Sequence, residues 1–347
     1  MEKEIIFSSK PKVLFVCKDR SEYGKTYGLT NSASFVSHWL NDQGVRSHVA
    51  MVSDNNGIDK VVTEYNPTHV FIEALWVTPE KIAELLAIQR HKKRIWVVRL
   101  HSRPVFLALE GIAFTWLLGY KKLGLKQLYI APNTKEFTDD LVRYGLKTAY
   151  LPNIYYPEPT DNMCPKKPFD GHSIDIGCFG AIRPMKNHMT QAIAAIEFAQ
   201  REGLRLNFHV NQRMEQGGET IMKNLRALFD NYKNYYLVEH DWHSHVEFMD
   251  LIRNTHLGMQ VSLTETFNIV AADYVAAGVG IVGSPQVTWL PEIFQADPNS
   301  TDSIRGKLAF AWGWLGQSLK CMSERALLHS SKAAEKEWSR FLCLSNT

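Results

Sequence analysis

The 347-residue sequence predicts an α/β protein built from two doubly wound domains, each with a parallel sheet. Short apolar runs alternate with amphipathic runs along nearly the whole chain, which is the pattern of strand–helix–strand units. A proline-rich segment interrupts this alternation near the middle of the chain. The length also fits two domains, at roughly 100 to 200 residues per domain.

In the first half, the apolar run at 12–17 predicts a strand, and the periodic run at 29–43 predicts a helix that ends at Gly44. Further strands are expected at 47–52, 69–73, 95–99, 127–130 and 148–151. Helices are expected at 79–89, 104–120 and 136–144. Strands that are separated by helices pair in parallel, so this half predicts one doubly wound sheet.

The second half follows a segment whose prolines, at positions 152, 157, 159, 165 and 168, disfavour regular pairing. Strands are then expected at 174–179, 205–210, 235–238, 258–262 and 280–283. Helices are expected at 188–201, 219–231, 245–254 and 268–277, and two more in the tail at 303–344. The expected organisation is an N-terminal domain at 1–152, a linker at 153–171 and a C-terminal domain at 172–302. Tail helices follow at 303–347, and they could pack back on the first domain.

Composition excludes several classes of protein. Hydrophobic residues make up 45% and charged residues 22% of the chain, as in ordinary soluble globular proteins. The five cysteines include no CxxC pair, which argues against a disulfide framework and a zinc knuckle. The N-terminus lacks the apolar core of a secretory signal, and the apolar stretch at 105–118 is shorter than the roughly 20 residues that cross a bilayer. We therefore expect a cytoplasmic protein without membrane insertion.

The segment 262–284 contains the first candidate site. Glu265 stands in the turn after a predicted strand, and a helix begins at Phe267 or Asn268. Free amide groups and the positive dipole end of such a helix form an anion site that suits a diphosphate. Asp273 lies eight residues after Glu265, so the two carboxylates can reach different parts of one elongated ligand, such as a sugar and a ribose.

A cationic loop forms the second candidate site. It begins at Gly180, where a predicted strand ends, and it contains Arg183 and Lys186. Asn187 follows as a plausible cap of an alanine-rich helix. Two cations beside a helix start can offset the charge that develops on a departing diphosphate, so the chemistry requires no metal ion.

These two segments resemble motifs of the retaining glycosyltransferases with the GT-B fold, the glycogen-synthase-like group. The segment 262–284 is similar to the family's E-x7-E motif, with Asp273 where the family has a second glutamate, and the cationic loop is similar to its G-x-x-R-P-x-K-N loop. The resemblance implies two Rossmann-like domains that face a cleft, and a nucleotide-diphosphate sugar, above all a UDP-sugar, as donor. It implies that Glu265 contacts the donor sugar, that Asp273 contacts the ribose, and that Arg183 and Lys186 bind the diphosphate.

The resemblance also implies roles for other residues. His101 follows a predicted strand where the family has a histidine near the reaction centre. Gly24 lies in a loop that contacts donor phosphate in the family, although a flexible surface loop suits its residues equally well. Trp242 and His243 fall in the family's base-binding loop, and with no cysteine nearby a zinc site is not expected there. The expected donor-binding residues are Gly24, Arg183, Lys186, Trp242, His243, Phe267, Asn268, Ile269 and Asp273.

The acceptor is less defined than the donor. The segments at 16–24, 52–60 and 67–77 resemble glycosyltransferase-like proteins of tailed bacteriophages. This resemblance implies, as one hypothesis, that the acceptor is a 5-hydroxymethylpyrimidine in phage DNA. Basic residues at 92–94, Arg99 and Arg103 would suit an anionic polymer if they face the acceptor, although the net charge of +3 is modest. The alternatives are a glycan or small-molecule acceptor, a nucleotide-sugar epimerase or hydrolase, and a non-catalytic nucleotide-sugar-binding protein.

The segment 105–124 is rich in aromatic residues and ends in Lys121 and Lys122. Its pattern predicts a core-packing helix with a basic end. Membrane-surface docking and acceptor contact remain as alternatives.

Overall fold

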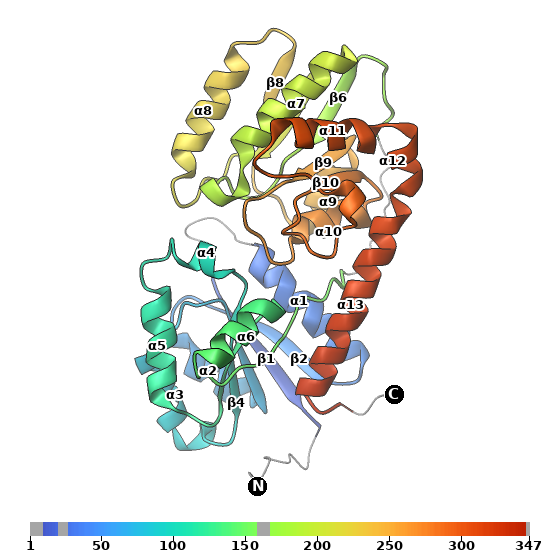
Figure 1. The fold of residues 1–347 in the computed structure, drawn as a ribbon. Helices are drawn as coiled ribbons and strands as arrows, with labels where there is room; N and C mark the ends of the chain where they lie inside the picture. The colour runs from blue at the N-terminus through green and yellow to red at the C-terminus, as the bar shows by residue number, and fades with distance from the viewer. Residues whose placement is uncertain (1–9, 20–26, 158–166, 345–347) are drawn as a thin grey trace. The chain divides into compact units, whose positions relative to one another are not determined.

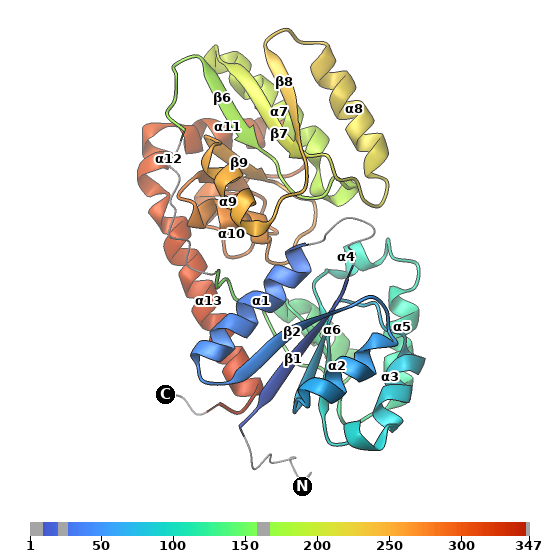
Figure 2. The same ribbon diagram turned by 180° about the vertical axis from the view of Figure 1, so that it is seen from behind.

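The computed structural model describes residues 10–19, 27–157 and 167–344. The chain forms two compact units: unit 1 comprises Met1–Glu158 with Ser331–Thr347, and unit 2 comprises Pro159–Ser330. Each unit contains one five-stranded sheet whose neighbouring strands all pair in parallel, with helices packed against it (Figures 1 and 2). The prediction of two doubly wound parallel sheets is confirmed.

The sheet of unit 1 has the strand order β2-β1-β3-β4-β5. Its strands are β1 Lys12–Lys18, β2 Arg46–Val52, β3 His69–Glu73, β4 Ile95–Leu100 and β5 Leu128–Pro132. Its helices are α1 Tyr27–Asp42, α2 Gly57–Tyr65, α3 Pro79–Ala87, the short η2 Gln89–His91, α4 Pro104–Leu107, α5 Ala113–Leu123 and α6 Lys135–Arg143. The chain order reverses between β1 and β3, and ligands bind at such switch points, beyond the carboxyl ends of the strands.

Alternating side chains of β1 enter two separate cores, one on each face of the sheet. Leu14 and Val16 belong to the core that α2, α3 and α5 cover. Val13 and Phe15 belong to the core that includes α1 and the end of α13 (Cys321–Phe341). Trp338 of α13 is fully buried there, and its indole N–H donates to the carbonyl of Pro152 at 2.8 Å. The C-terminal residues are therefore part of the core of unit 1.

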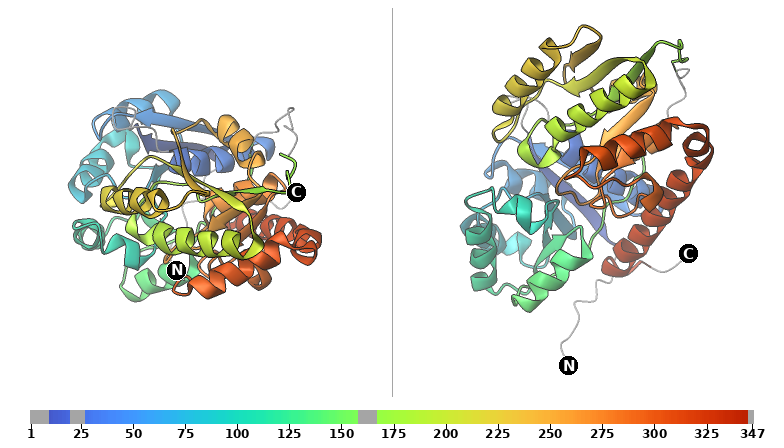
Figure 3. Two further views of the ribbon diagram at one scale, coloured as in Figure 1. Left: turned by 90° about the horizontal axis from the view of Figure 1, so that it is seen from above. Right: turned by 45° about the horizontal axis from the view of Figure 1, so that its top comes forward.

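The sheet of unit 2 has the strand order β10-β9-β6-β7-β8, with its switch point between β6 and β9. Its strands are β6 Ser173–Gly177, β7 Arg205–Asn211, β8 Tyr235–His240, β9 Leu257–Gln260 and β10 Gly280–Gly283. Its helices are η3 Pro184–Lys186, α7 His188–Glu202, α8 Gly218–Asp230, α9 His245–Arg253, α10 Ile269–Ala276, η4 Glu292–Phe294, α11 Thr301–Trp312 and α12 Trp314–Leu319. Helices α7 and α11 lie side by side in this unit (Figure 3).

Some expected elements are wrong in detail. The expected helix at 104–120 is interrupted at residues 108–112, between α4 and α5, where Gly111 weakens helix formation. The expected strand at 148–151 forms only an isolated bridge between Thr148 and Ile130, because Pro132 of β5 has no N–H to donate to the carbonyl of Ala149, which interrupts the ladder. The helix at 57–65 was not expected, since only Ile58 and Val62 of its nine residues are buried.

The tail contains three helices, α11, α12 and α13, instead of the expected two. Gly313 separates the first two, with an extended backbone at φ −65° and ψ 163°. No helix in the described part of the chain is both long and apolar enough to cross a membrane.

Candidate functional site

Two loops lie beside the switch point of unit 2. One joins β6 to α7 and the other joins β9 to α10, and hydrogen bonds tie them together. The amide N–H of Leu263 donates to the carbonyl of Met185 at 2.9 Å. The side-chain amide of Asn187 donates to the carbonyls of Val261 at 3.1 Å and of Pro298 at 2.8 Å. The predicted cationic loop and the predicted Glu265 turn therefore form one connected structure.

The buried side chain of Gln191 joins the same two loops from α7. Its carbonyl oxygen accepts the amide N–H of Val261 at 2.8 Å, and its NH₂ group donates to the carbonyl of Lys186 at 2.7 Å. Because a buried amide with both ends bonded allows little movement, Gln191 fixes the backbone of Lys186 relative to the end of β9.

Lys186 and Glu265 form the centre of the site. The Lys186 ammonium lies 2.5 Å from Oε2 of Glu265, and the Asn268 side-chain amide donates to the same oxygen at 3.1 Å. Burial alone would raise the pKa of Glu265, but the positive charge of Lys186, its hydrogen bond and the charge of Arg183 outweigh burial and hold that pKa below its ordinary value. Glu265 is therefore ionised at neutral pH and has a fixed orientation.

Arg183 lies at the border of this centre. Its guanidinium is 3.8 Å from Oε2 of Glu215, and the other carboxylate oxygen of Glu215 accepts from Arg213 at 2.9 Å. The Arg183 side chain retains 28% of its exposure, and its charge acts on Glu265. The structure therefore places the two predicted cations near one carboxylate, with Arg183 the more accessible.

The start of α10 offers backbone donors. Asn268 precedes the helix in the left-handed region, at φ +62°, and its side-chain oxygen accepts the amide N–H of Ala271 at 2.9 Å. No hydrogen bond within the described residues engages the amides of Ile269 and Val270. Phe267 is buried, and its carbonyl accepts the indole N–H of Trp289 at 2.7 Å. The first turn is thus held rigidly while two of its amides are available to an anion.

Asp273 lies further along α10, where it is almost fully buried. His245, the first residue of α9, contacts it through Nε2 at 2.9 Å. Burial opposes the charged form of His245, but the hydrogen bond and charge of Asp273 raise its pKa above the ordinary value. The sequence interpretation considered His245 only as part of a zinc site that was not expected, and it did not anticipate the contact with Asp273. The ribose contact of Asp273 stays a prediction.

Trp242 and His243 lie in the short loop between β8 and α9, and both are partly exposed. The guanidinium of Arg213 lies 5.4 Å from the centre of the Trp242 ring, a cation–π arrangement. Contact of this loop with a nucleobase stays a prediction. In the described ranges, no group of three or more histidine, cysteine, aspartate or glutamate side chains is arranged to hold a metal ion.

His101 of unit 1 belongs to a buried charged network at the carboxyl ends of β3 and β4. Its Nε2 lies 2.6 Å from Oε2 of Glu73, and the other oxygen of Glu73 lies 2.9 Å from the Arg99 guanidinium. Burial and the charge of Arg99 lower the pKa of His101 more than Glu73 raises it, so the imidazole is neutral near pH 7. Sequence reasoning missed Glu73. The available signal was a carboxylate at the end of an otherwise apolar strand.

The basic residues at 92–94, Arg99 and Arg103 do not lie together on one face of unit 1. Arg99 is fully buried and paired with Glu73. Arg94 is also buried, and its guanidinium donates hydrogen bonds to a backbone oxygen and a side-chain oxygen. Residues 92–93 precede β4, whereas His101 follows its other end, so these lysines lie at the opposite edge of the sheet. Gly24 lies outside the described residues.

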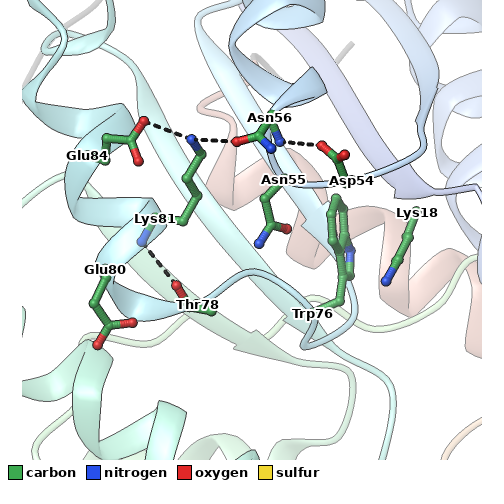
Figure 4. Close-up of a pocket in the computed structure, with 9 residues that line it drawn as sticks. All are labelled: Lys18, Asp54, Asn55, Asn56, Trp76, Thr78, Glu80, Lys81 and Glu84. Atoms are coloured by element: carbon green, nitrogen blue, oxygen red, sulfur yellow. Dashed lines mark hydrogen bonds and ion pairs between the residues drawn. The ribbon is translucent and has the colours of Figure 1, made fainter.

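Unit 1 also contains a polar pocket of about 470 Å³, within the range of small-molecule sites (Figure 4). The loops after β1, β2 and β3 line it together with the start of α3. Lys81 bridges Glu84 at 2.7 Å and Asn56 at 3.3 Å on one side, and Trp76 supplies an aromatic ring. Its charged lining residues are Lys18, Asp54, Glu80, Lys81 and Glu84.

No protein-family model matches the sequence, and no curated protein matches it. Solved structures resemble it closely in fold. HepE of Anabaena, in complex with UDP and glucose, superposes with a TM-score of 0.65 at 13% identity, over 96% of this chain and 100% of that chain. The UDP-forming α,α-trehalose-phosphate synthase of Burkholderia xenovorans, in complex with glucose-6-phosphate, gives a TM-score of 0.70 at 13% identity, over 95% and 99%.

A glycosyltransferase from Rickettsia africae gives a TM-score of 0.61 at 10% identity, over 97% of this chain and 100% of that chain. These likenesses extend over both units and, together with the two strand orders, show that the chain has the GT-B fold. The predicted fold class is confirmed.

Proposed function

We propose that the chain is a glycosyltransferase that uses a nucleotide-diphosphate sugar as donor. The observation that carries this proposal is the arrangement of Lys186, Arg183 and Glu265 beside the start of α10, at the switch point of unit 2. Two cations and two available backbone amides suit a diphosphate, and a fixed carboxylate suits sugar hydroxyl groups. The similar HepE structure is described in complex with UDP-glucose, which supports a UDP-sugar.

In the proposed reaction, the bond between the anomeric carbon and the diphosphate oxygen breaks, and the acceptor oxygen bonds to that carbon on the same face. The acceptor proton passes to the departing diphosphate, so configuration is retained. Lys186 and Arg183 offset the negative charge that grows on the diphosphate, without need for a metal ion. Glu265 orients the sugar, and His101 contacts it as a neutral imidazole.

The remaining donor contacts are part of the same proposal. Asp273 would meet the ribose, and Trp242 or His243 would meet the base. Phe267 and Ile269 would shape the phosphate site through the first turn of α10.

His101 leads to a pH prediction. Because its pKa lies below 6.5, the rate of sugar transfer is expected to be constant between about pH 7 and pH 8.5 and to fall only as acid protonates the imidazole. The His101→Asn variant is expected to be slower and to lack this acid limb. A pH–rate series for both proteins checks this. An acid limb in the wild type with a midpoint above 6.5, absent from the variant, would show that the imidazole is not held neutral.

For the acceptor, we propose a hydroxyl group of a glycan or small molecule in preference to DNA. The pocket of unit 1 has three carboxylates against two ammonium groups, and Arg94 and Arg99 are buried and internally paired. A phosphate backbone is held by several accessible cations, whereas the two lysines of this pocket, Lys18 and Lys81, are outnumbered by its carboxylates. Carboxylates, amides and an aromatic ring suit an uncharged polyhydroxyl compound.

The test is a panel of nucleotide sugars, with release of nucleoside diphosphate followed alone, with glycan acceptors and with hydroxymethylated DNA. Acceptor-dependent release supports the proposal, and DNA-dependent release would replace the glycan acceptor by DNA. Free sugar without an acceptor would indicate a hydrolase, and an isomerised donor an epimerase. Thermal stabilisation by a donor without any turnover would indicate a binding protein.

A further inference from the structure

The segment from α4 to α5 exposes an unusual amount of apolar surface on unit 1. Five large apolar side chains within 14 consecutive residues are between 41% and 61% exposed. We call them the apolar face: Val105, Leu109, Ile112, Phe114 and Leu118. Isolated exposed apolar residues are common, but five of them in one short segment are a candidate interaction surface.

The exposure follows from how α5 is anchored. Leu117 and Tyr120 are buried in the core of unit 1, and the Tyr120 hydroxyl donates to the carbonyl of Val77. Gly119 packs so closely that a Cβ there would lie 2.5 Å from the ring of Pro79. The helix therefore cannot rotate to bury Phe114 and Leu118 without leaving the core, so the apolar face is part of the folded unit.

The segment that carries the apolar face has a positive net charge. Residues 103–126 contain four basic side chains and a single acid, Glu110, a net charge of +3 that equals the net charge of the whole chain. Lys121, Lys122 and Lys126 are exposed at the end of α5. Lys121 also lies 5.5 Å from the ring of Tyr144, an exposed aromatic residue. Apolar side chains next to lysines and a tyrosine are typical of helices that lie in a membrane interface.

We propose that the apolar face docks on the surface of an anionic lipid bilayer. The five apolar side chains enter the boundary between headgroups and acyl chains, while Lys121, Lys122 and Lys126 contact lipid phosphates. The attachment is peripheral. Helix α4 begins three residues after His101, whereas Lys126 lies just before β5, so the proposed lipid contact runs along α5 from the His101 edge of the sheet to the opposite edge.

Vesicle sedimentation tests this proposal. The full chain is expected to bind vesicles of equal parts phosphatidylcholine and phosphatidylglycerol at least about tenfold more tightly than phosphatidylcholine alone, because the lysines add to apolar insertion. The triple variant Ile112→Ser/Phe114→Ser/Leu118→Ser is expected to lose at least about tenfold in binding to the anionic vesicles. The double variant Lys121→Gln/Lys122→Gln is expected to lose most of the preference for anionic lipid.

The matched control is Trp314→Ser/Leu328→Ser, which removes two exposed apolar side chains of unit 2 and is expected to bind as the wild type does. Circular dichroism confirms that each variant is folded. Wild-type protein that stays in the supernatant with anionic vesicles, or a triple variant that binds them equally well, would overturn the proposal. A wild-type dimer that the triple variant abolishes would also overturn the proposal, since the apolar face would then be the interface between two copies of the chain. The assay contains no nucleotide sugar, so its outcome is independent of the proposed function.

Discussion

Replacing Lys186 with alanine is expected to lower kcat for sugar transfer by about 10²- to 10³-fold, the usual cost of removing one preorganised charge stabiliser. The ammonium does two things in the structure: it lies beside the start of α10, where a diphosphate would bind, and it holds Glu265 at 2.5 Å. Loss of Lys186 therefore removes a positive charge that offsets the charge on the departing diphosphate. It also frees the carboxylate of Glu265. Initial rates at saturating donor measure the effect.

Glu265→Gln separates these two contributions. It keeps the size of the side chain and leaves Lys186 in place, so a large loss in this variant shows that the carboxylate itself takes part. Arg226→Ala is the control, because Arg226 forms an exposed ion pair with Glu239 elsewhere in unit 2. If Lys186→Ala retained a rate within threefold of the control, the assignment of the site would be wrong.

The largest expected effect on stability comes from Glu73. Glu73→Leu is expected to lower the free energy of unfolding by about 3–5 kcal/mol, because it leaves the Arg99 guanidinium buried without its partner. The pKa of Glu73 is held below its ordinary value of 4.5, since the charge of Arg99 and the bond to His101 outweigh burial. The contribution is therefore present at neutral pH and is lost as the pH falls through the folded-state pKa.

Chemical denaturation of the single and double variants tests whether Glu73 and Arg99 stabilise unit 1 as a buried pair. The double variant Glu73→Leu/Arg99→Met is expected to recover most of the lost stability, since two apolar side chains can replace a buried ion pair at little cost. A double variant that is as unstable as the sum of both single variants would contradict the pairing. Transitions of the two units should be followed separately, because a two-domain chain need not unfold in one step.

Much of the architecture is predictable from local patterns. The strands at 69–73 and 280–283 are found where expected, because each is a short apolar run bounded by turn signals. Lys186 and Glu265 lie 79 residues apart, yet each was assigned to the carboxyl end of a strand. The topology of a doubly wound sheet brings such ends together at the switch point, so the pair could be anticipated without knowledge of any side-chain contact.

The contacts that orient these residues could not be predicted. Glu73 meets Arg99 only because β3 and β4 are neighbours with those two residues in register. His245 meets Asp273 across 28 residues, and Gln191 reaches Val261 across 70. Each contact depends on which elements pack together, and one-dimensional periodicity carries no information about that. The break in the expected helix at 104–120 has the same origin, since tertiary packing decides where a weak helix divides.

We propose that Arg183 and Lys186 together bind the diphosphate of a nucleotide sugar. Titration calorimetry with UDP-glucose tests it most directly, on the wild type, on Arg183→Ala/Lys186→Ala and on the Arg226→Ala control. We expect one site on the wild type and on the control, and a loss of affinity of at least about a hundredfold in the double variant, as expected for two charge-assisted contacts. A double variant that binds UDP-glucose as tightly as the control, or a wild type that binds no nucleotide sugar, would contradict the claim.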